Sequence, residues 1–184
     1  MIPGPALRAL LGLYLFLTAL WTGALLAFAG GAGLVLRAAP TRADGGVVNR
    51  ALLDLLDVAS LALAGLLLVL AFALNRTRPW SRTVRGFSLR LLAVAAVAAF
   101  VSLYLITPEM VALRTKAGAA FDLLPATDPL RRAWGRLHGL SLLTLLVRLV
   151  CAATAFALAF VQLPREPVGS AAPESPVTPP GGSS

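Results

Sequence analysis

Residues 51–74 read ALLDLLDVASLALAGLLLVLAFAL, and this stretch decides the fold class. Beyond Asp54 and Asp57 it holds no charged residue and a single polar one, Ser60. A run of this length crosses a bilayer core of about 30 Å as a helix, whereas a helix at a water interface needs a polar face. We therefore predict a transmembrane helix over residues 47–74, opened by carboxylates that suit the positive end of the helix dipole.

Three more apolar runs predict helices over residues 7–36, 87–106 and 129–162. The chain has 184 residues, of which 58% are hydrophobic and 13% charged, and a soluble domain cannot hide so much apolar surface. The sequence predicts an all-α integral membrane four-helix bundle that forms one domain over residues 7–163. The tail, residues 164–184, is rich in Pro, Ser and Gly and is expected to be disordered.

Breaker and capping residues set the expected connections. Pro40 and the pair Gly45-Gly46 predict a loop over residues 37–49. Thr107-Pro108 should end or kink the third helix, and part of residues 109–127 should continue as an interfacial helix. Asp128-Pro129 is a strong helix start, because Asp accepts backbone N–H groups and Pro fits the first helical position.

The first predicted helix is rich in glycine. Gly23, Gly30, Gly31 and Gly33 would weaken a helix in water. In lipid they indicate that a neighbouring backbone approaches closely.

The net charge of +8 is carried mostly by short connections rather than by a soluble face. Basic residues placed in this way set membrane topology and meet anionic headgroups, so the expected partner is a lipid bilayer and not nucleic acid. The charged residues of the connection over residues 75–90 are all basic. It is therefore predicted to be cytoplasmic, together with the amino terminus and the tail.

The middle of the last predicted helix carries a charge, Arg148. An arginine facing lipid at this depth is penalised by at least about 2.5 kcal/mol, so it should face the bundle. His138, Ser141, Thr144 and Cys151 precede or follow it at steps of three or four and predict a polar stripe on one face.

The stripe predicts a salt bridge to the second helix. Arg148 should pair with Asp57, or failing that with Asp54, because these carboxylates open an adjacent helix that runs parallel to the last one. Arg148 either locks two helices together through this salt bridge or contacts an anion or a substrate. His138 should face the second helix, either hydrogen-bonded and buried or acting as a proton relay.

Several chemistries are excluded by counting residues. One histidine and the methionines Met1 and Met110 make paired haem ligation improbable, and Cys151 is the single cysteine. No phosphate-binding loop, dinucleotide fingerprint or serine-hydrolase context occurs. The sequence predicts no cofactor, no metal site and no enzyme activity.

Three short segments carry a family resemblance. Residues 134–141, Trp-Gly-Arg-Leu-His-Gly-Leu-Ser, resemble the signature that opens the last helix of the transmembrane protein 205-like family, which in bacteria is domain-of-unknown-function family 4149. Residues 20–24 and 46–50 resemble its patterns in the first helix and at the start of the second. The resemblance implies four transmembrane helices, a bacterial inner (cell) membrane and no established activity.

Three functions remain open at this point. The first is a non-enzymatic membrane protein, such as an envelope assembly or homeostasis factor. The second is a subunit of a small transporter or channel that uses the polar stripe, in which case a homo-oligomer would enclose more space. The third is a metal-handling protein of the copper-resistance type, which the scarcity of ligands disfavours. No small-molecule ligand is identified.

Overall fold

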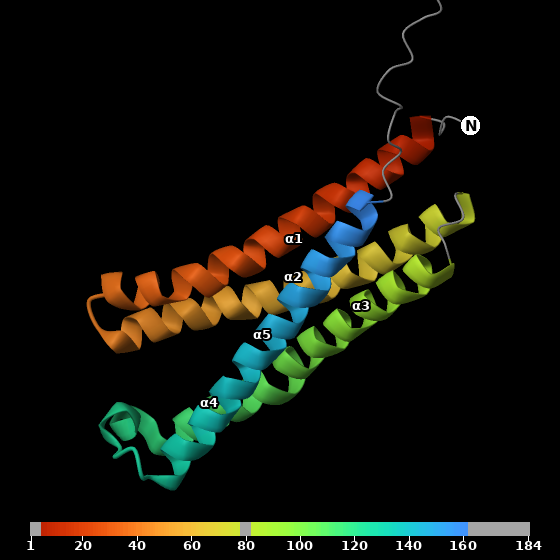
Figure 1. Ribbon diagram of the computed structural model, residues 1–184. Coiled ribbons are helices and arrows are strands. Elements are labelled where there is room, and N and C mark those ends of the chain that lie inside the picture. Colours follow the sequence, from red (N-terminus) through yellow and green to blue (C-terminus); the bar gives the residue numbers. More distant parts are fainter. Residues whose placement is uncertain (1–4, 78–81, 162–184) are drawn as a thin grey trace, which may run out of the picture.

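The computed structural model describes residues 5–77 and 82–161, and these are helical with short connections (Figure 1). The elements in chain order are α1 (Pro5–Ala38), α2 (Arg42–Thr77), α3 (Arg82–Val101), the π-helical segment η1 (Ser102–Ile106), α4 (Thr107–Ala117), the 3-10 segment η2 (Gly118–Leu123) and α5 (Pro129–Val161). Four helical stretches are long and apolar enough to cross a membrane. The predicted all-α four-helix architecture is confirmed.

The four long helices pack in a ring. Helix α1 contacts α2, α2 contacts α3, α3 contacts α5, and α5 returns to α1. Consequently α2 and α5 lie diagonally across the bundle rather than side by side. One end of the bundle holds the start of α1, the end of α2, the start of α3 and the end of α5 (Figure 1). This is the arrangement expected of four consecutive crossings.

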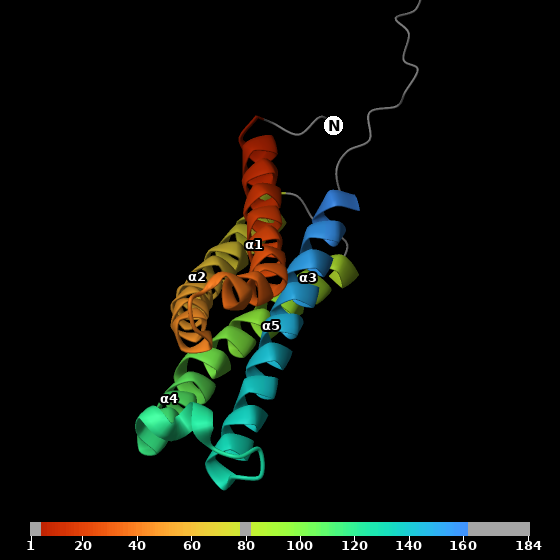
Figure 2. The ribbon, with the colours of Figure 1, turned by 90° about the vertical axis from the view of Figure 1, so that its left-hand side faces the viewer.

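Among the described residues, the main hydrophobic core lies in one half of the bundle. The buried side chains of α1 run from Leu11 to Leu25, and those of α5 from Ser141 to Ala159. On α2, residues 46–56 include no buried side chain, and Asp57 is the first of a buried series. In the other half the α1–α2 hairpin diverges from α4 and the start of α5 (Figures 1 and 2). Asp57 therefore marks the border between the two halves.

The turn between α1 and α2 is shorter than predicted. The expected loop over residues 37–49 is wrong, because α2 already begins at Arg42 and includes Gly45-Gly46. Thr41 caps the helix: its hydroxyl accepts the Asp44 N–H at 3.2 Å and donates to the Asp44 carboxylate at 2.8 Å. This reciprocal cap starts the helix ahead of the glycines.

Close backbone approach occurs at Gly45 and not at the glycines expected. A Cβ at Gly23, Gly30, Gly31 or Gly33 would meet nothing within 4 Å in the part of the chain that the structure describes. A Cβ at Gly45 would lie 3.1 Å from the Leu36 Cα and 3.1 Å from the Ala39 Cβ. Glycine is thus needed where α2 folds back against the end of α1.

Gly45→Ala should lower the free energy of unfolding by about 1–3 kcal/mol, because the added methyl group meets backbone that must shift. Thermal unfolding in detergent would measure the loss. Gly23→Ala is the matched control, since its methyl group enters open space and should cost nothing. Equal effects of the two substitutions would contradict the tight turn.

Thr107-Pro108 was predicted to end or kink the third crossing, and the structure shows that the helix does not end there. The chain stays helical from α3 through η1 and α4 to Ala117. Proline lacks an N–H and clashes with the preceding turn, and a wider π segment directly before it accommodates this. In that segment the Thr107 N–H donates to the Ser102 carbonyl, five residues back.

The last helix begins where the sequence indicates. The Asp128 carboxylate accepts the Leu130 N–H at 2.8 Å, so the predicted Asp-Pro start of α5 is confirmed. The predicted end of this helix at residue 162 and the tail over residues 164–184 lie outside the described residues.

Candidate functional site

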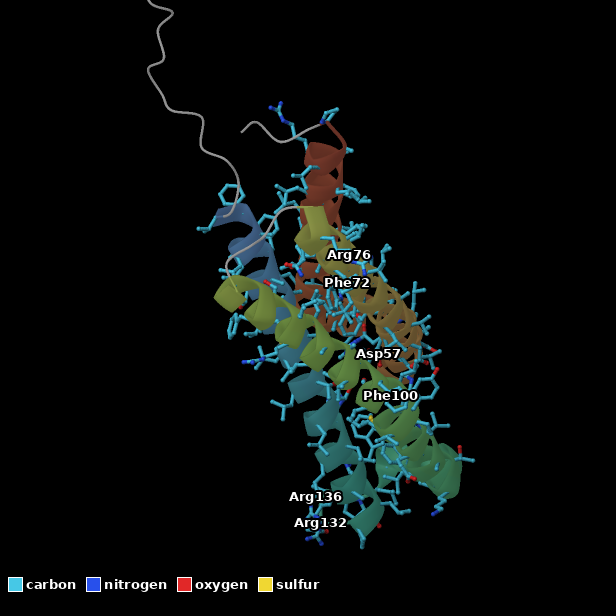
Figure 3. The ribbon with its side chains drawn as sticks, turned by 90° about the vertical axis from the view of Figure 1, so that its right-hand side faces the viewer. Asp57, Phe72, Arg76, Phe100, Arg132 and Arg136 are labelled. Carbon is cyan, nitrogen blue, oxygen red and sulfur yellow. The ribbon has the colours of Figure 1, made fainter. Side chains whose placement is uncertain are left out.

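A buried ion pair joins α2 and α5 at the border of the packed core. Arg148 Nη1 lies 2.5 Å from Asp57 Oδ1, and both side chains are 0% exposed. The Arg148 Nε also donates to the Thr144 carbonyl at 3.3 Å. The predicted Arg148–Asp57 pair is confirmed, but the two helices are not adjacent. The long arginine side chain instead reaches Asp57 across the diagonal of the bundle. Figure 3 shows Asp57 inside the bundle.

The π-helical segment supplies a second partner to the carboxylate. Ser102, the first residue of η1, donates its hydroxyl to Asp57 Oδ2 at 2.6 Å and is fully buried. Each carboxylate oxygen of Asp57 thus has its own donor. The hydrogen bond and the ion pair tie α2, η1 and α5 together at one level.

Helix α1 joins the same level through an indole. The Trp21 Nε1 donates to the Ser60 Oγ at 3.0 Å, and both side chains are buried. Ser60 lies one turn beyond Asp57 on α2. We call Trp21, Asp57, Ser60, Ser102 and Arg148 the charge layer, and it involves all four crossings.

The sequence predicts only part of the charge layer. It marks Ser60 as the lone polar residue of its run, but it gives Trp21 and Ser102 no predicted partner. A signal existed for each. A deeply placed indole N–H needs an acceptor, and Ser102 is an isolated hydroxyl in an apolar run before a proline.

The charge layer is electrically neutral but has one polar atom left over. Arg148 Nη2 is buried and has no hydrogen-bond partner among the described residues. A charged group shielded from water is tolerated only when it is paired, which Asp57 achieves for the guanidinium as a whole. The leftover N–H is the point of the layer at which a further acceptor would be favourable.

The polar stripe of α5 faces inward over part of its length. Ser141, Arg148 and Cys151 are buried, and Thr144 is partly buried. The Thr144 hydroxyl donates to the Ser141 carbonyl at 2.8 Å, so it is satisfied within its own helix. The stripe therefore adds no second charged contact to the layer.

His138 does not belong to the buried stripe. It lies on α5 as predicted, but it is exposed, and its ring stacks on Trp134 with centroids 5.1 Å apart. The prediction that it faces the second helix is wrong. At about 100° per residue, ten residues of helix place His138 roughly 80° away from the direction of Arg148.

Asp54 belongs to a separate ion pair. Its carboxylate lies 2.9 Å from Arg50 Nε, and its side chain is 42% exposed. Arg50 also donates from Nη2 to the Thr107 carbonyl at 3.4 Å, which links α2 to the start of α4. Asn49 donates to the Ala32 carbonyl of α1 at 2.9 Å. Asp54 is therefore not an alternative partner of Arg148, and residues 46–50 organise the hairpin.

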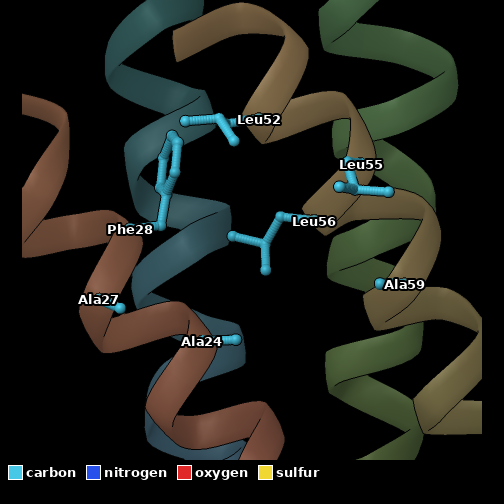
Figure 4. A pocket seen from close by; sticks show the side chains of 7 residues that line it. All are labelled: Ala24, Ala27, Phe28, Leu52, Leu55, Leu56 and Ala59. Atoms are coloured by element: carbon cyan, nitrogen blue, oxygen red, sulfur yellow. The ribbon is translucent and has the colours of Figure 1, made fainter. Parts of the chain in front are cut away.

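A pocket of about 420 Å³ lies between α1 and α2, but its lining carries no chemistry (Figure 4). The described side chains that line it come from residues 24–28 and 52–59 and are all apolar. Among residues 5–77 and 82–161, no three His, Cys, Asp or Glu side chains converge as they would around a metal ion.

The helices and the buried layer define a multi-pass helical membrane protein. The chain belongs to the family described as a domain of unknown function, DUF4149, which it matches over residues 16–119. This range includes Trp21, Asp57, Ser60 and Ser102, and it ends before α5. No curated protein and no solved structure matches the chain. The resemblance to the transmembrane protein 205-like family stays a prediction.

Proposed function

We propose that the protein is a non-enzymatic factor of the bacterial inner membrane that serves envelope assembly or homeostasis, and that its charge layer is structural. The supporting observation is the 0% exposure of both Asp57 and Arg148. A group that contacts a substrate must be reached by it, whereas these side chains are enclosed by α2, η1 and α5. The layer fixes how the two hairpins meet, in the way that a buried polar group can specify one packing arrangement.

A deletion strain tests this role. Loss of the gene should raise sensitivity to detergents or chelators that stress the envelope. A structural layer predicts that a chain with both Asp57→Leu and Arg148→Leu restores resistance, because an apolar pair of similar volume is often tolerated. Failure of this stable double variant to restore resistance would overturn the structural role. A deletion strain without any envelope phenotype would overturn the proposed process.

A transporter or channel subunit is the second candidate. Two observations favour it. Arg148 Nη2 is buried without a hydrogen-bond partner among the described residues. Residues 46–56 of α2 include no buried side chain. In this alternative, water or an anion enters from the end of the bundle that holds the α1–α2 turn and reaches Arg148.

Thiol labelling in membranes separates the two candidates. Cys151 lies one turn beyond Arg148 on the packed side and is buried, so a membrane-impermeant thiol reagent should not label it. Thr144→Cys in a Cys151→Ala chain probes the other side of Arg148 and should also stay unlabelled before denaturation. Ala126→Cys in the exposed loop before α5 is the positive control. Labelling of Thr144→Cys in the folded protein would favour the transporter.

A further inference from the structure

Two arginines one turn apart lie on the outer face of α5. Arg132 and Arg136 are exposed and project from the side of the helix away from α4 (Figure 3). Arg132 donates from Nε and Nη2 to the Thr127 carbonyl, which satisfies N–H groups but neutralises no charge. Arg136 has no side-chain partner among the described residues. The nearby Asp128 carboxylate caps the helix by accepting backbone N–H groups.

The depth of these arginines matches the lipid phosphates. Helix α5 spans Pro129–Val161, so its middle residue is Leu145. With Leu145 at the bilayer centre and a rise of 1.5 Å per residue, Arg136 lies about 14 Å and Arg132 about 20 Å from the centre. The apolar core ends at about 15 Å. Both guanidinium groups therefore reach the headgroup region, and Trp134 lies between them in the zone that indoles favour.

Small residues surround Arg136 on the same face. Gly135 and Gly139 are exposed, and a Cβ at either would meet nothing within 4 Å. Leu143, one turn beyond Gly139, is 54% exposed. Along this outer face the arginines come first, the bare backbone at Gly139 follows, and the apolar side chain of Leu143 comes last. This order matches the phosphate, the glycerol and an acyl chain of a phospholipid.

We propose that this face of α5 binds a phospholipid with an anionic headgroup. Its phosphate lies between Arg132 and Arg136, and the part of an acyl chain nearest the headgroup runs over Gly139 and Leu143. Like charges one turn apart on a helix repel, and an anion between them removes that repulsion. Guanidinium groups suit a phosphate because they donate paired hydrogen bonds to its oxygens. The site rests on charges outside the bundle, so it is independent of the role of the charge layer.

Native mass spectrometry of the full chain in detergent would measure lipid retention. Phosphatidylglycerol should be retained in preference to phosphatidylcholine. An arginine near a membrane surface contributes roughly 1 kcal/mol, so Arg136→Ala should weaken phosphatidylglycerol binding about fivefold and the variant with Arg132→Ala as well about thirtyfold. Arg37→Ala is the matched control, because Arg37 is an exposed arginine at the end of α1 on the same side of the membrane. It should change binding less than twofold.

Further variants separate a built site from diffuse attraction. Gly139→Leu should weaken phosphatidylglycerol retention at unchanged charge by filling the bare backbone. Millimolar inorganic phosphate should not displace the lipid, because it lacks the acyl chain. Equal losses in Arg37→Ala and Arg136→Ala, equal retention of the two lipids, or displacement by phosphate would each overturn the proposal. Thermal unfolding of each variant in zwitterionic detergent checks that the fold is unchanged.

Discussion

Arg148→Leu should lower the free energy of unfolding by about 3–5 kcal/mol, because it leaves the Asp57 carboxylate buried without its cation. Asp57→Leu should cost a similar amount, since it strands the guanidinium. Both side chains are 0% exposed, so water cannot take the place of the missing partner without opening the bundle. Equilibrium denaturation in detergent micelles would measure each loss.

The double substitution is the discriminating variant. Asp57→Leu with Arg148→Leu should recover much of the stability, so the two losses should not add. Ser102 should then lose its acceptor, and adding Ser102→Ala to the double variant should cost little, although Ser102→Ala alone removes a donor from a buried carboxylate. Simple addition of the single losses would show that the residues are not energetic partners.

The Arg50–Asp54 pair on the same helix provides a control. Its side chains are 26% and 42% exposed, and exposed pairs contribute at most about 1 kcal/mol. Replacing both of these residues should therefore change the unfolding free energy much less than replacing Arg148 alone. Equal losses of unfolding free energy for the two pairs would show that burial is not the reason for the large contribution of the Arg148–Asp57 pair.

The four crossings and the Arg148–Asp57 pair could be predicted from the sequence for the same reason, namely the free-energy cost of exposing polar or charged groups to the bilayer core. Apolar runs of this length admit one structure in a bilayer, and a charge at mid-helix demands a partner of opposite sign. Few carboxylates lie within apolar runs, so Asp57 could be chosen by depth alone. Which helices are neighbours depends on side-chain packing around the ring, and for this reason the diagonal position of α2 and α5 was not foreseen.

The uncharged members of the charge layer escaped prediction for a physical reason. A serine hydroxyl in a helix can donate a hydrogen bond to the backbone of its own helix. Nothing in the sequence pattern therefore requires Ser102 to have a partner on another helix. Helical-wheel reasoning also assumes 3.6 residues per turn, and a π segment changes the direction of every side chain after it. The same reasoning placed His138 inside, because a stripe of steps of three and four drifts over several turns. The pair Gly45-Gly46 predicts a loop, whereas the structure places both residues in α2 and needs glycine at Gly45 for the tight turn.

Trp21→Ala should be the second severe substitution, with a loss of about 3–5 kcal/mol. Trp21 is 1% exposed and has the largest fully buried side chain among the described residues. Its removal leaves a cavity between α1 and α2 that the bundle cannot close without shifting a helix. Trp134→Ala is the matched control. Trp134 is only half-buried at the start of α5, where it contacts Phe121 and His138, and its loss should be clearly smaller.

Two milder variants divide the Trp21 effect into packing and hydrogen bonding. Trp21→Phe keeps most of the ring volume but deletes the N–H that Ser60 accepts, so it should cost about 1 kcal/mol beyond the volume change. Ser60→Ala leaves the indole N–H buried without an acceptor, and it should become nearly silent once Trp21→Phe is present. If Ser60→Ala costs the same in both backgrounds, the hydrogen bond contributes nothing, and α1 is held to the charge layer by apolar packing alone.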